Sequence, residues 1–388
     1  MAESQTRSQA SRVARVQIFD NMQAVEELWR RMETPEQVFT PYQRFDFLAT
    51  WQKHVGVNQH LKPFIVVAYD AECRPLMLLP LALKQDKSVR VARFLGGKHS
   101  TFNMPIWRRD FVTAASTADL DKVWDAVRDH AQPVDVLALI QQPQRWQGLV
   151  NPLSQLPSQA SVNACPLLLI APNASPAERI SNSFRRRLKG KERKLQALPG
   201  YRYVRATTDA DIKRLLDAFF VIKPARMASQ KLPNVFADPG VEDFVRDACM
   251  TRLADGSHAI EIHALDSEEE TIAIFAGVAD DLRFSMMFNT YTMSANARYS
   301  PGLILIRDIV DFYAERGYTS LDLGIGSDDY KQLFCKTREP IFDSFLALNA
   351  RGKLAAGGMS ALSHAKRMVK ETPALMKAAQ VLRGAIHR

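Results

Sequence analysis

A short segment in the second half of the chain has the residue types of a phosphate-binding helix start. It reads Tyr299-Ser300-Pro301-Gly302-Leu303. Ser300 is a favourable helix N-cap and Pro301 suits the first helical position. Gly302 has no side chain to keep a ligand from the backbone. Free amides at such a helix end bind phosphate, so we predict a pyrophosphate site here, with an ordinary helix cap as the alternative.

A second candidate segment follows about twenty residues later. It reads Leu321-Asp322-Leu323-Gly324-Ile325-Gly326, and Tyr330-Lys331 comes soon after it. We expect a strand to end at this segment, where glycine lets a ligand or substrate approach the backbone. The alternative is that Asp322 caps the turn and Tyr330 packs in the core.

The elements predicted around these segments define the fold class. Three strands in succession precede the helix, and a strand, a short helix and a last strand follow it. A β-meander followed by a βαβ crossover makes a mixed sheet, so we predict an α/β protein of the α+β, mixed-sheet kind. The ranges are 257–265, 271–279 and 282–292 for the meander, then 303–316, 318–323, 328–336 and 341–349.

The first half has a similar alternation of strands and helices, which indicates a degenerate duplication. A stretch rich in Gln, Pro and Ser, residues 141–159, separates the halves. We predict four regions in chain order. They are a disordered tail over 1–15, an N-terminal domain over 16–160, a C-terminal domain over 161–350 and a basic amphipathic helical tail over 351–388.

Together these motifs resemble the GNAT acyltransferase superfamily over roughly residues 16–349. The Ser-Pro-Gly helix start and the Asp-x-Gly-x-Gly then Tyr-Lys pattern resemble its CelD/BcsL-type members, bacterial acetyltransferases linked to cellulose and exopolysaccharide synthesis. In the first half, Thr40-Pro41-Tyr42-Gln43 and Ser100-Thr101-Phe102-Asn103 resemble that family in order. The helix start departs from the usual GNAT loop, which has more glycines.

The resemblance implies tandem GNAT-like domains with one acyl-CoA site, in the second half. Acetyl-CoA or another acyl-CoA would be the co-substrate, and Tyr330 would protonate the leaving thiolate. Asp322 would orient or deprotonate the acceptor. The implied cofactor-binding residues are Ser300, Pro301, Gly302, Leu303, Met286 and Met287, and the implied substrate-binding residues are Asn103, Gly324 and Lys331.

Three functions remain open from the sequence. The first is an N- or O-acyltransferase in which a sugar, nucleotide-sugar or amine acceptor attacks the thioester directly. The second is a Fem-like aminoacyl-tRNA-dependent transferase. The third is a non-catalytic scaffold of a polysaccharide synthesis complex. The intact helix start and Tyr330 favour the first.

Basic residues are concentrated in two places, although the net charge of the chain is +9. A predicted helix over residues 181–197 has seven basic residues and one acidic residue, and residues 351–388 have eight and one. Local blocks of this kind indicate specific anion-binding surfaces rather than DNA binding. The helix is small for a tRNA, so we expect a phosphate ligand, RNA or a solvated face there.

Several classes of protein are disfavoured by composition. The four cysteines and eight histidines are scattered, so we expect neither a disulfide framework nor a metal site. No apolar run approaches the length of a membrane span. We therefore expect a cytoplasmic protein. The tail, with apolar residues at helical spacing, could contact an anionic inner-membrane surface or pack on the body.

Overall fold

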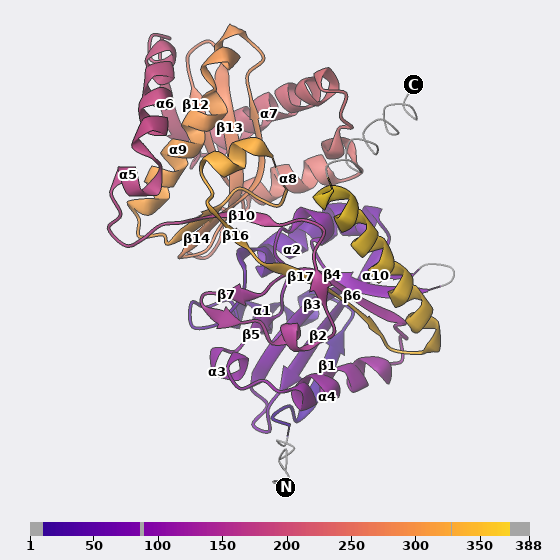
Figure 1. Ribbon diagram of the computed structural model, residues 1–388. Coiled ribbons are helices and arrows are strands. Elements are labelled where there is room, and N and C mark those ends of the chain that lie inside the picture. The colour runs from indigo at the N-terminus through magenta and orange to yellow at the C-terminus, as the bar shows by residue number, and fades with distance from the viewer. Residues whose placement is uncertain (1–10, 86–88, 327, 373–388) are drawn as a thin grey trace.

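The computed structural model describes residues 11–85, 89–326 and 328–372, which fold around two mixed sheets (Figure 1). The predicted fold class is confirmed. The first sheet has the strand order β1-β2-β3-β4-β6-β17-β9, and β5 pairs with β3. Its strands are β1 (Arg15–Phe19), β2 (Leu61–Tyr69), β3 (Pro75–Gln85), β4 (Arg90–Phe94), β5 (Ile106–Trp107), β6 (Val136–Pro143), β9 (Gln159–Ala160) and β17 (Ile341–Ala347).

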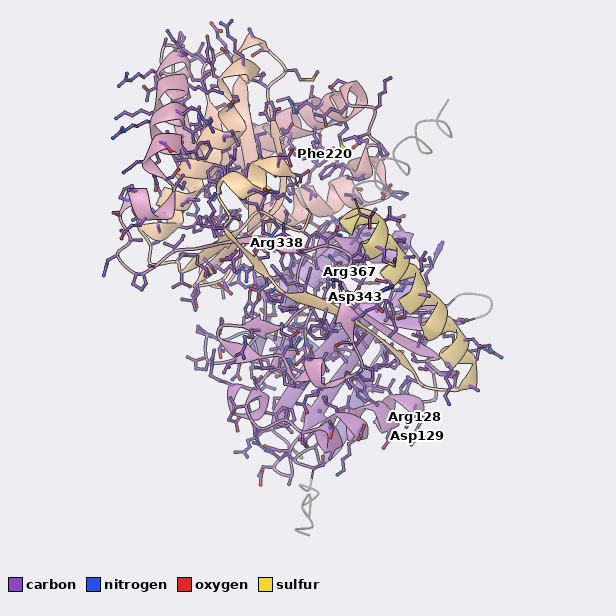
Figure 2. The ribbon with its side chains drawn as sticks, viewed as in Figure 1. Arg128, Asp129, Phe220, Arg338, Asp343 and Arg367 are labelled. Atoms are coloured by element: carbon purple, nitrogen blue, oxygen red, sulfur yellow. The ribbon has the colours of Figure 1, made fainter. Side chains whose placement is uncertain are left out.

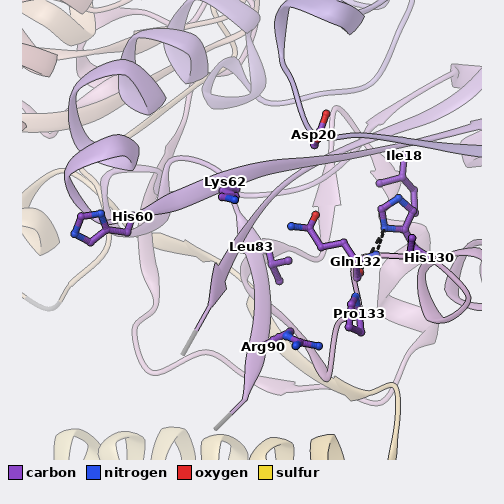
Figure 3. Close-up of a pocket in the computed structure, with 10 residues that line it drawn as sticks. Ile18, Asp20, His60, Lys62, Leu83, Arg90, His130, Gln132 and Pro133 are labelled. Carbon is purple, nitrogen blue, oxygen red and sulfur yellow. Dashed lines mark hydrogen bonds between the residues drawn. The ribbon is translucent and has the colours of Figure 1, made fainter. Parts of the chain in front are cut away.

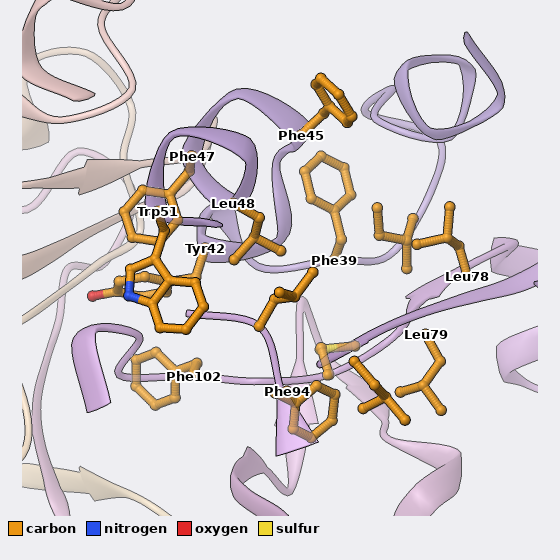
Figure 4. Packing of buried hydrophobic residues seen from close by; sticks show 14 of the residues in the cluster. Phe39, Tyr42, Phe45, Phe47, Leu48, Trp51, Leu78, Leu79, Phe94 and Phe102 are labelled. Carbon is orange, nitrogen blue, oxygen red and sulfur yellow. The ribbon is translucent and has the colours of Figure 1, made fainter. Parts of the chain in front are cut away.

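Aromatic side chains fill the core against this sheet. The helices α1 (Glu26–Arg31), α2 (Phe45–Trp51) and α4 (Thr117–Arg128) belong to this half. Figure 4 shows Tyr42, Phe47 and Trp51 packed near Phe102. Each of these four side chains is almost fully buried, and burial of one such ring stabilises the fold by roughly 2–3 kcal/mol.

The second sheet has the order β11-β12-β13-β14-β15-β10-β16 and contains the predicted meander. Figure 1 shows α6 and α9 on one side of it and α7 and α8 on the other. The strands are β10 (Cys165–Leu169), β11 (Arg202–Arg205), β12 (Glu261–Asp266), β13 (Thr271–Ala279), β14 (Arg283–Tyr291), β15 (Ser320–Asp322) and β16 (Thr337–Glu339). The helices are α6 (Asn182–Leu195), α7 (Asp209–Ser229), α8 (Val241–Met250) and α9 (Pro301–Ala314).

The last strand does not belong to the sheet in which its sequence position would place it. We expected residues 341–349 to complete the second domain, but β17 pairs with β6 and β9 of the first sheet. The chain leaves β16 at Glu339 and enters the first sheet two residues later. One hydrophobic cluster also includes side chains of both halves, among them Phe47 and Phe244, whose rings are 5.4 Å apart. The halves are therefore interlocked.

The two ends of the chain differ from expectation in part. Residues 11–15 of the predicted disordered tail are ordered, since Val13 is buried and the Arg12 amide donates to Asp119 at 2.6 Å. The C-terminal helix α10 (Ala350–Glu371) lies across β6 and β17 (Figure 1). It packs there through Ala356 and Met359. The second apolar repeat of the tail, after Pro373, lies outside the described residues.

Within the described ranges, no helix combines the length and apolarity that a bilayer crossing requires.

The interlocking gives a test. We expect a chain ending at residue 340 to lose cooperative unfolding of the first half. β6 would keep β4 but lose its antiparallel partner β17, and Ile341, Phe342 and Leu348 would leave the core. Each lost side chain costs roughly 2 kcal/mol. Circular dichroism melting would measure the loss, with a chain ending at residue 372 as the control. Equal melting temperatures for the two chains would contradict the interlocked arrangement.

Candidate active site

The candidate site lies where two parallel strands of the second sheet separate. β14 and β15 pair only over Arg283–Ser285 and Ser320–Asp322. β15 then ends, whereas β14 continues to Tyr291. On this edge the β14 backbone beyond Ser285 therefore faces the loop after β15 instead of a partner strand, while its other edge stays paired with β13.

A β-bulge marks the same part of β14. Ala276 pairs with Phe288 and Gly277 pairs with Met286, so Met287 is the extra residue. A Cβ at Gly277 would lie 2.3 Å from the Ser285 carbonyl oxygen, so the close approach requires glycine. Bulges redirect backbone groups, and this one falls at Met286 and Met287, which were expected to bind the cofactor.

The N-terminus of α9 lies beside this strand, but its cap differs from the prediction. Ser300 has left-handed backbone angles, φ 56° and ψ 51°, and its side chain does not cap the helix. Its hydroxyl instead accepts a hydrogen bond from the Lys191 ammonium at 2.7 Å. Pro301 does occupy the first turn, as predicted. The helix end therefore gains a cation from α6, while the Leu303 amide already donates to the Ser300 carbonyl oxygen at 3.0 Å.

A cavity of about 250 Å³ opens at this helix end. Gly302 and Leu303 of α9 line it, together with Asn289 and Tyr291 of β14 and with Tyr330. A Cβ at Gly302 would lie 3.5 Å from the Tyr291 ring, an ordinary contact, so a larger side chain would fill the cavity rather than break the fold. The predicted residues thus form a cradle beside the unpaired edge of β14.

A second cavity, of about 400 Å³, adjoins the first, and both have Asn289 and Tyr330 in their walls. Met286, Met287, Gly324 and Lys331 line the second cavity, so five of the predicted site residues meet there, Tyr330 included. Its remaining wall is largely apolar and includes side chains of α7, α8 and the first half of the chain. The site therefore lies between the halves.

Tyr330 is placed to serve both cavities. It lies on a short 3-10 helix, Asp329–Leu333, which replaces the longer helix expected over 328–336. Burial and the nearby Asp328 carboxylate raise the pKa of the Tyr330 hydroxyl, and an interaction with Asn289 opposes them. The phenol therefore stays protonated at neutral pH, as a proton donor must.

Asp322 does not reach either cavity. Its side chain is fully buried and accepts hydrogen bonds from Arg283 Nε at 3.0 Å, Ser285 Oγ at 2.5 Å and the Gly324 amide at 3.0 Å. Every one of these donors is protein, so the prediction that Asp322 acts on the acceptor does not fit the geometry. Asp322 is a positioning residue that holds the strand end and the turn after it.

Lys331 and Gly324 shape the loop after β15. The buried Lys331 ammonium donates to the carbonyl oxygens of Gly324 at 3.2 Å and Ile325 at 3.0 Å. Gly324 has φ +71°, and a Cβ there would lie 3.0 Å from the Met286 carbonyl oxygen. Both residues line the second cavity, but their hydrogen bonds and close approach first fix the loop against β14.

Asn103 is not among the residues that line either cavity. It is buried in the first half, where its amide nitrogen donates to the Ile140 carbonyl at 3.3 Å. The predicted 100–103 loop does reach the second cavity, but through Thr101, and His99 precedes it there. The expected contact thus comes from neighbouring residues.

Two polar residues of the second cavity, His99 and Lys223, were not predicted from the sequence. His99 accepts the Trp51 indole N–H at Nδ1, 3.0 Å away, so its proton is on Nε2. Burial lowers its pKa to about 4, so the ring is neutral at pH 7. Lys223 of α7 donates to the Asn289 carbonyl at 3.0 Å, and burial lowers its pKa as well. Only the tertiary fold brings these two side chains to β14.

The two faces of the basic helix α6 differ in their contacts. Arg185 forms an ion pair with Asp311 of α9 at 2.5 Å, and Lys191 binds Ser300. Arg186 and Lys189 are exposed, as are Arg193 and Lys194. Figure 2 shows side chains of α6 projecting away from the body. One face of the helix thus supports the α9 cradle and the other is free to bind an anion.

A large cavity is remote from this site. It measures about 800 Å³ and lies on the first half of the chain, between the ends of β1 and β2 and the segment after α4 (Figure 3). His60, Lys62, Arg90 and His130 line it, and none is a predicted site residue. Among the described residues, no cluster of His, Cys, Asp or Glu suits a metal ion.

Comparison with protein families agrees with the geometry. Residues 182–332 match the family model for the acetyltransferase (GNAT) domain, a segment that begins at α6 and ends just after Tyr330. This match indicates an acyltransferase of the GNAT type. A search of curated proteins finds no match to the chain.

Solved structures show the same fold over both halves. One is the C-terminal domain of a putative lysylphosphatidylglycerol synthetase from Agrobacterium fabrum, with TM-score 0.51, 11% identity, and coverage of 88% of this chain and 98% of that one. A protein of unknown function from Bacteroides thetaiotaomicron has TM-score 0.52 and 12% identity, with coverage of 86% and 100%. FemX has TM-score 0.52 and 8% identity, with coverage of 80% and 96%. Each likeness covers both sheets, consistent with tandem GNAT-like domains.

The burial of Asp322 predicts the effect of its removal. Asp322→Asn should lower the free energy of unfolding by about 3 kcal/mol. The buried Arg283 guanidinium would lose the negative charge of Asp322 and would keep only that of Glu339. Chemical denaturation would measure this, with the exposed neighbour Asp281→Asn as the control. Unchanged stability with a loss of turnover would instead assign Asp322 to the chemistry.

Proposed function

We propose that the protein transfers an acyl group from acyl-CoA, most simply acetyl-CoA, to an amine or hydroxyl of a small acceptor. The observation that carries this proposal is the pair of adjoining cavities that share Tyr330 and Asn289 at the split between β14 and β15. One cavity has the features of a phosphate cradle and the other those of an acceptor site.

In this proposal the co-substrate phosphates bind at the start of α9. The positive helix end attracts them, and Lys191 adds a cation at Ser300. The pantetheine arm would run along the unpaired edge of β14, where backbone amides form hydrogen bonds to it. The redirected backbone at the Met287 bulge would then meet the thioester oxygen.

The acceptor would enter from the second cavity and attack the thioester carbon. As the new C–N or C–O bond forms and the C–S bond breaks, Tyr330 gives its phenolic proton to the leaving sulfur. The acceptor gives up its own proton to solvent water. Tyr330 is then reprotonated from solvent, so the enzyme returns to its starting state.

The acceptor class of this proposal is a sugar, nucleotide sugar or amine, with exopolysaccharide or cell-envelope synthesis as the setting. The CelD/BcsL-like motifs support it. We further propose that the basic face of the tail makes a weak, salt-sensitive contact with anionic membranes. Lys353, Lys366 and Lys370 of α10 are exposed, which supports that contact.

A Fem-like transfer from aminoacyl-tRNA is the second candidate. Two observations favour it, namely the likeness of the fold to FemX over 96% of that chain and the exposed cations of α6. Thermal-shift titration separates the candidates. Stabilisation by acetyl-CoA or a longer acyl-CoA supports the first, stabilisation by aminoacyl-tRNA alone supports the second, and no response to either supports a scaffold.

Filling the cradle should abolish co-substrate binding. In Gly302→Val the added methyl groups would occupy the cavity beside Tyr291, so we expect calorimetry to detect no acetyl-CoA binding while the melting temperature is kept. Gly357→Val on α10 is the matched control, because a Cβ there meets open space. Wild-type affinity in Gly302→Val would exclude a site at this helix end.

Removing the phenol should slow the chemistry and spare binding. Tyr330→Phe should lower turnover by roughly 10²- to 10⁴-fold and leave acetyl-CoA affinity nearly unchanged, because only the proton transfer is lost. Steady-state rates with an accepted amine or sugar would measure this, and Tyr69→Phe in the first half is the control. A wild-type rate would assign Tyr330 to packing.

A further inference from the structure

A third cavity continues from the acceptor side of the site. It measures about 460 Å³ and lies between α10 and the first sheet. Lys98 and Ile325 belong to its wall and also to the wall of the acceptor cavity. The two cavities are therefore neighbours, separated by these two side chains. We call the third cavity the α10 groove.

The floor and one wall of the α10 groove are apolar. These residues come from β6, β17 and α10. They are Ala138, Ile140, Ile341, Phe345, Met359 and Leu362. Leu362 lines this groove and is 57% exposed. A large apolar side chain exposed in a groove is typical of a surface that a ligand covers.

The charges of the α10 groove favour an anion. Arg93, Lys98 and Lys366 line it, against one carboxylate, Asp343. That carboxylate is buried beneath α10 (Figure 2) and is already used, since it accepts from the Gln141 amide at 2.9 Å and from Ser161 and Ser363. Lys98 pairs with Asp238.

In the described part of the chain, no carboxylate forms an ion pair with Arg93 or with Lys366. Both cations therefore remain available to a ligand. Because both cations lie beside the apolar wall, one groove offers a ligand both ionic and hydrophobic contacts.

We propose that the α10 groove binds an amphiphilic acceptor, with a hydrocarbon chain along the apolar wall and a phosphate at the cations. Its nucleophilic amine or hydroxyl would pass Lys98 and Ile325 into the acceptor cavity. The proposal rests on the proposed acyltransferase function and names the substrate class of that same site. A free phosphate or a short sugar would leave the apolar wall uncovered.

Binding of a simple probe tests the groove. Calorimetry on the full chain would use monododecyl phosphate below its micelle-forming concentration. We expect saturable binding, and affinity lower by roughly tenfold or more for inorganic phosphate, which lacks the chain, and for dodecyl maltoside, which lacks the charge.

Matched variants locate the binding. Leu362→Asp and Arg93→Gln should each weaken monododecyl phosphate binding by roughly tenfold. Leu354→Asp and Lys353→Gln are the controls, since both residues are exposed on α10 outside the groove, Leu354 at 84%. They should leave the affinity within about twofold. Melting curves check that all four variants fold.

Several results would overturn the proposal. One is the absence of saturable binding, and another is an equal effect of Leu362→Asp and Leu354→Asp on the affinity. A third is binding that is confined to phosphatidylglycerol vesicles and unaffected by Leu362→Asp, since this would indicate surface adsorption by the tail. Acetyl-CoA affinity, measured on the same variants, reports the proposed function separately. If it persists while the probe fails to bind, the groove assignment alone is wrong.

Discussion

The site depends on one buried cation. Arg283 is almost fully enclosed, and its guanidinium donates to Asp322 at 3.0 Å and to Glu339 at 2.9 Å. Its carbon centre lies over the rings of Phe102 at 4.6 Å and Trp146 at 4.7 Å, both from the first half of the chain. An unpaired charge here would cost several kcal/mol, so the strand ends and the two aromatic rings must be present together.

The need to pair the buried Arg283 also fixes the point at which β14 and β15 separate. Asp322 ends β15 because its carboxylate turns back to the Gly324 amide and inward to Arg283. The loop that follows is then drawn toward Lys331, which donates to its carbonyl oxygens. With β15 ended and the loop held aside, β14 continues past Tyr330 paired only with β13. The cavities are a consequence of this anchored end rather than of flexible loops.

Much of the fold was predictable, since it depends on local patterns. The meander before Pro301, the helix that this proline opens and the short helix bearing Tyr330 follow from residue spacing and turn chemistry. The backbone of Ser300 did not follow, since neither its left-handed angles nor its contact with Lys191 of α6 has a local sequence pattern.

Other features lay beyond sequence reasoning because they depend on distant segments. The apolar run of β17 indicates a buried strand but not which sheet it joins. A carboxylate such as Asp322 has the same residue type whether it meets substrate or a buried arginine. His99 and Lys223 are far apart in sequence and line the same cavity only in the folded protein, so no spacing rule could find them.

Because β17 pairs in the first sheet, that sheet can be completed only late in the synthesis of the chain. β6 is complete at Pro143, whereas its neighbour ends at Ala347, after the whole second sheet has been made. At about 5–20 residues per second, the ribosome needs roughly 10–40 s to supply the missing strand. Throughout that interval the nascent first half has an open sheet edge, and it is the state that a chaperone would meet.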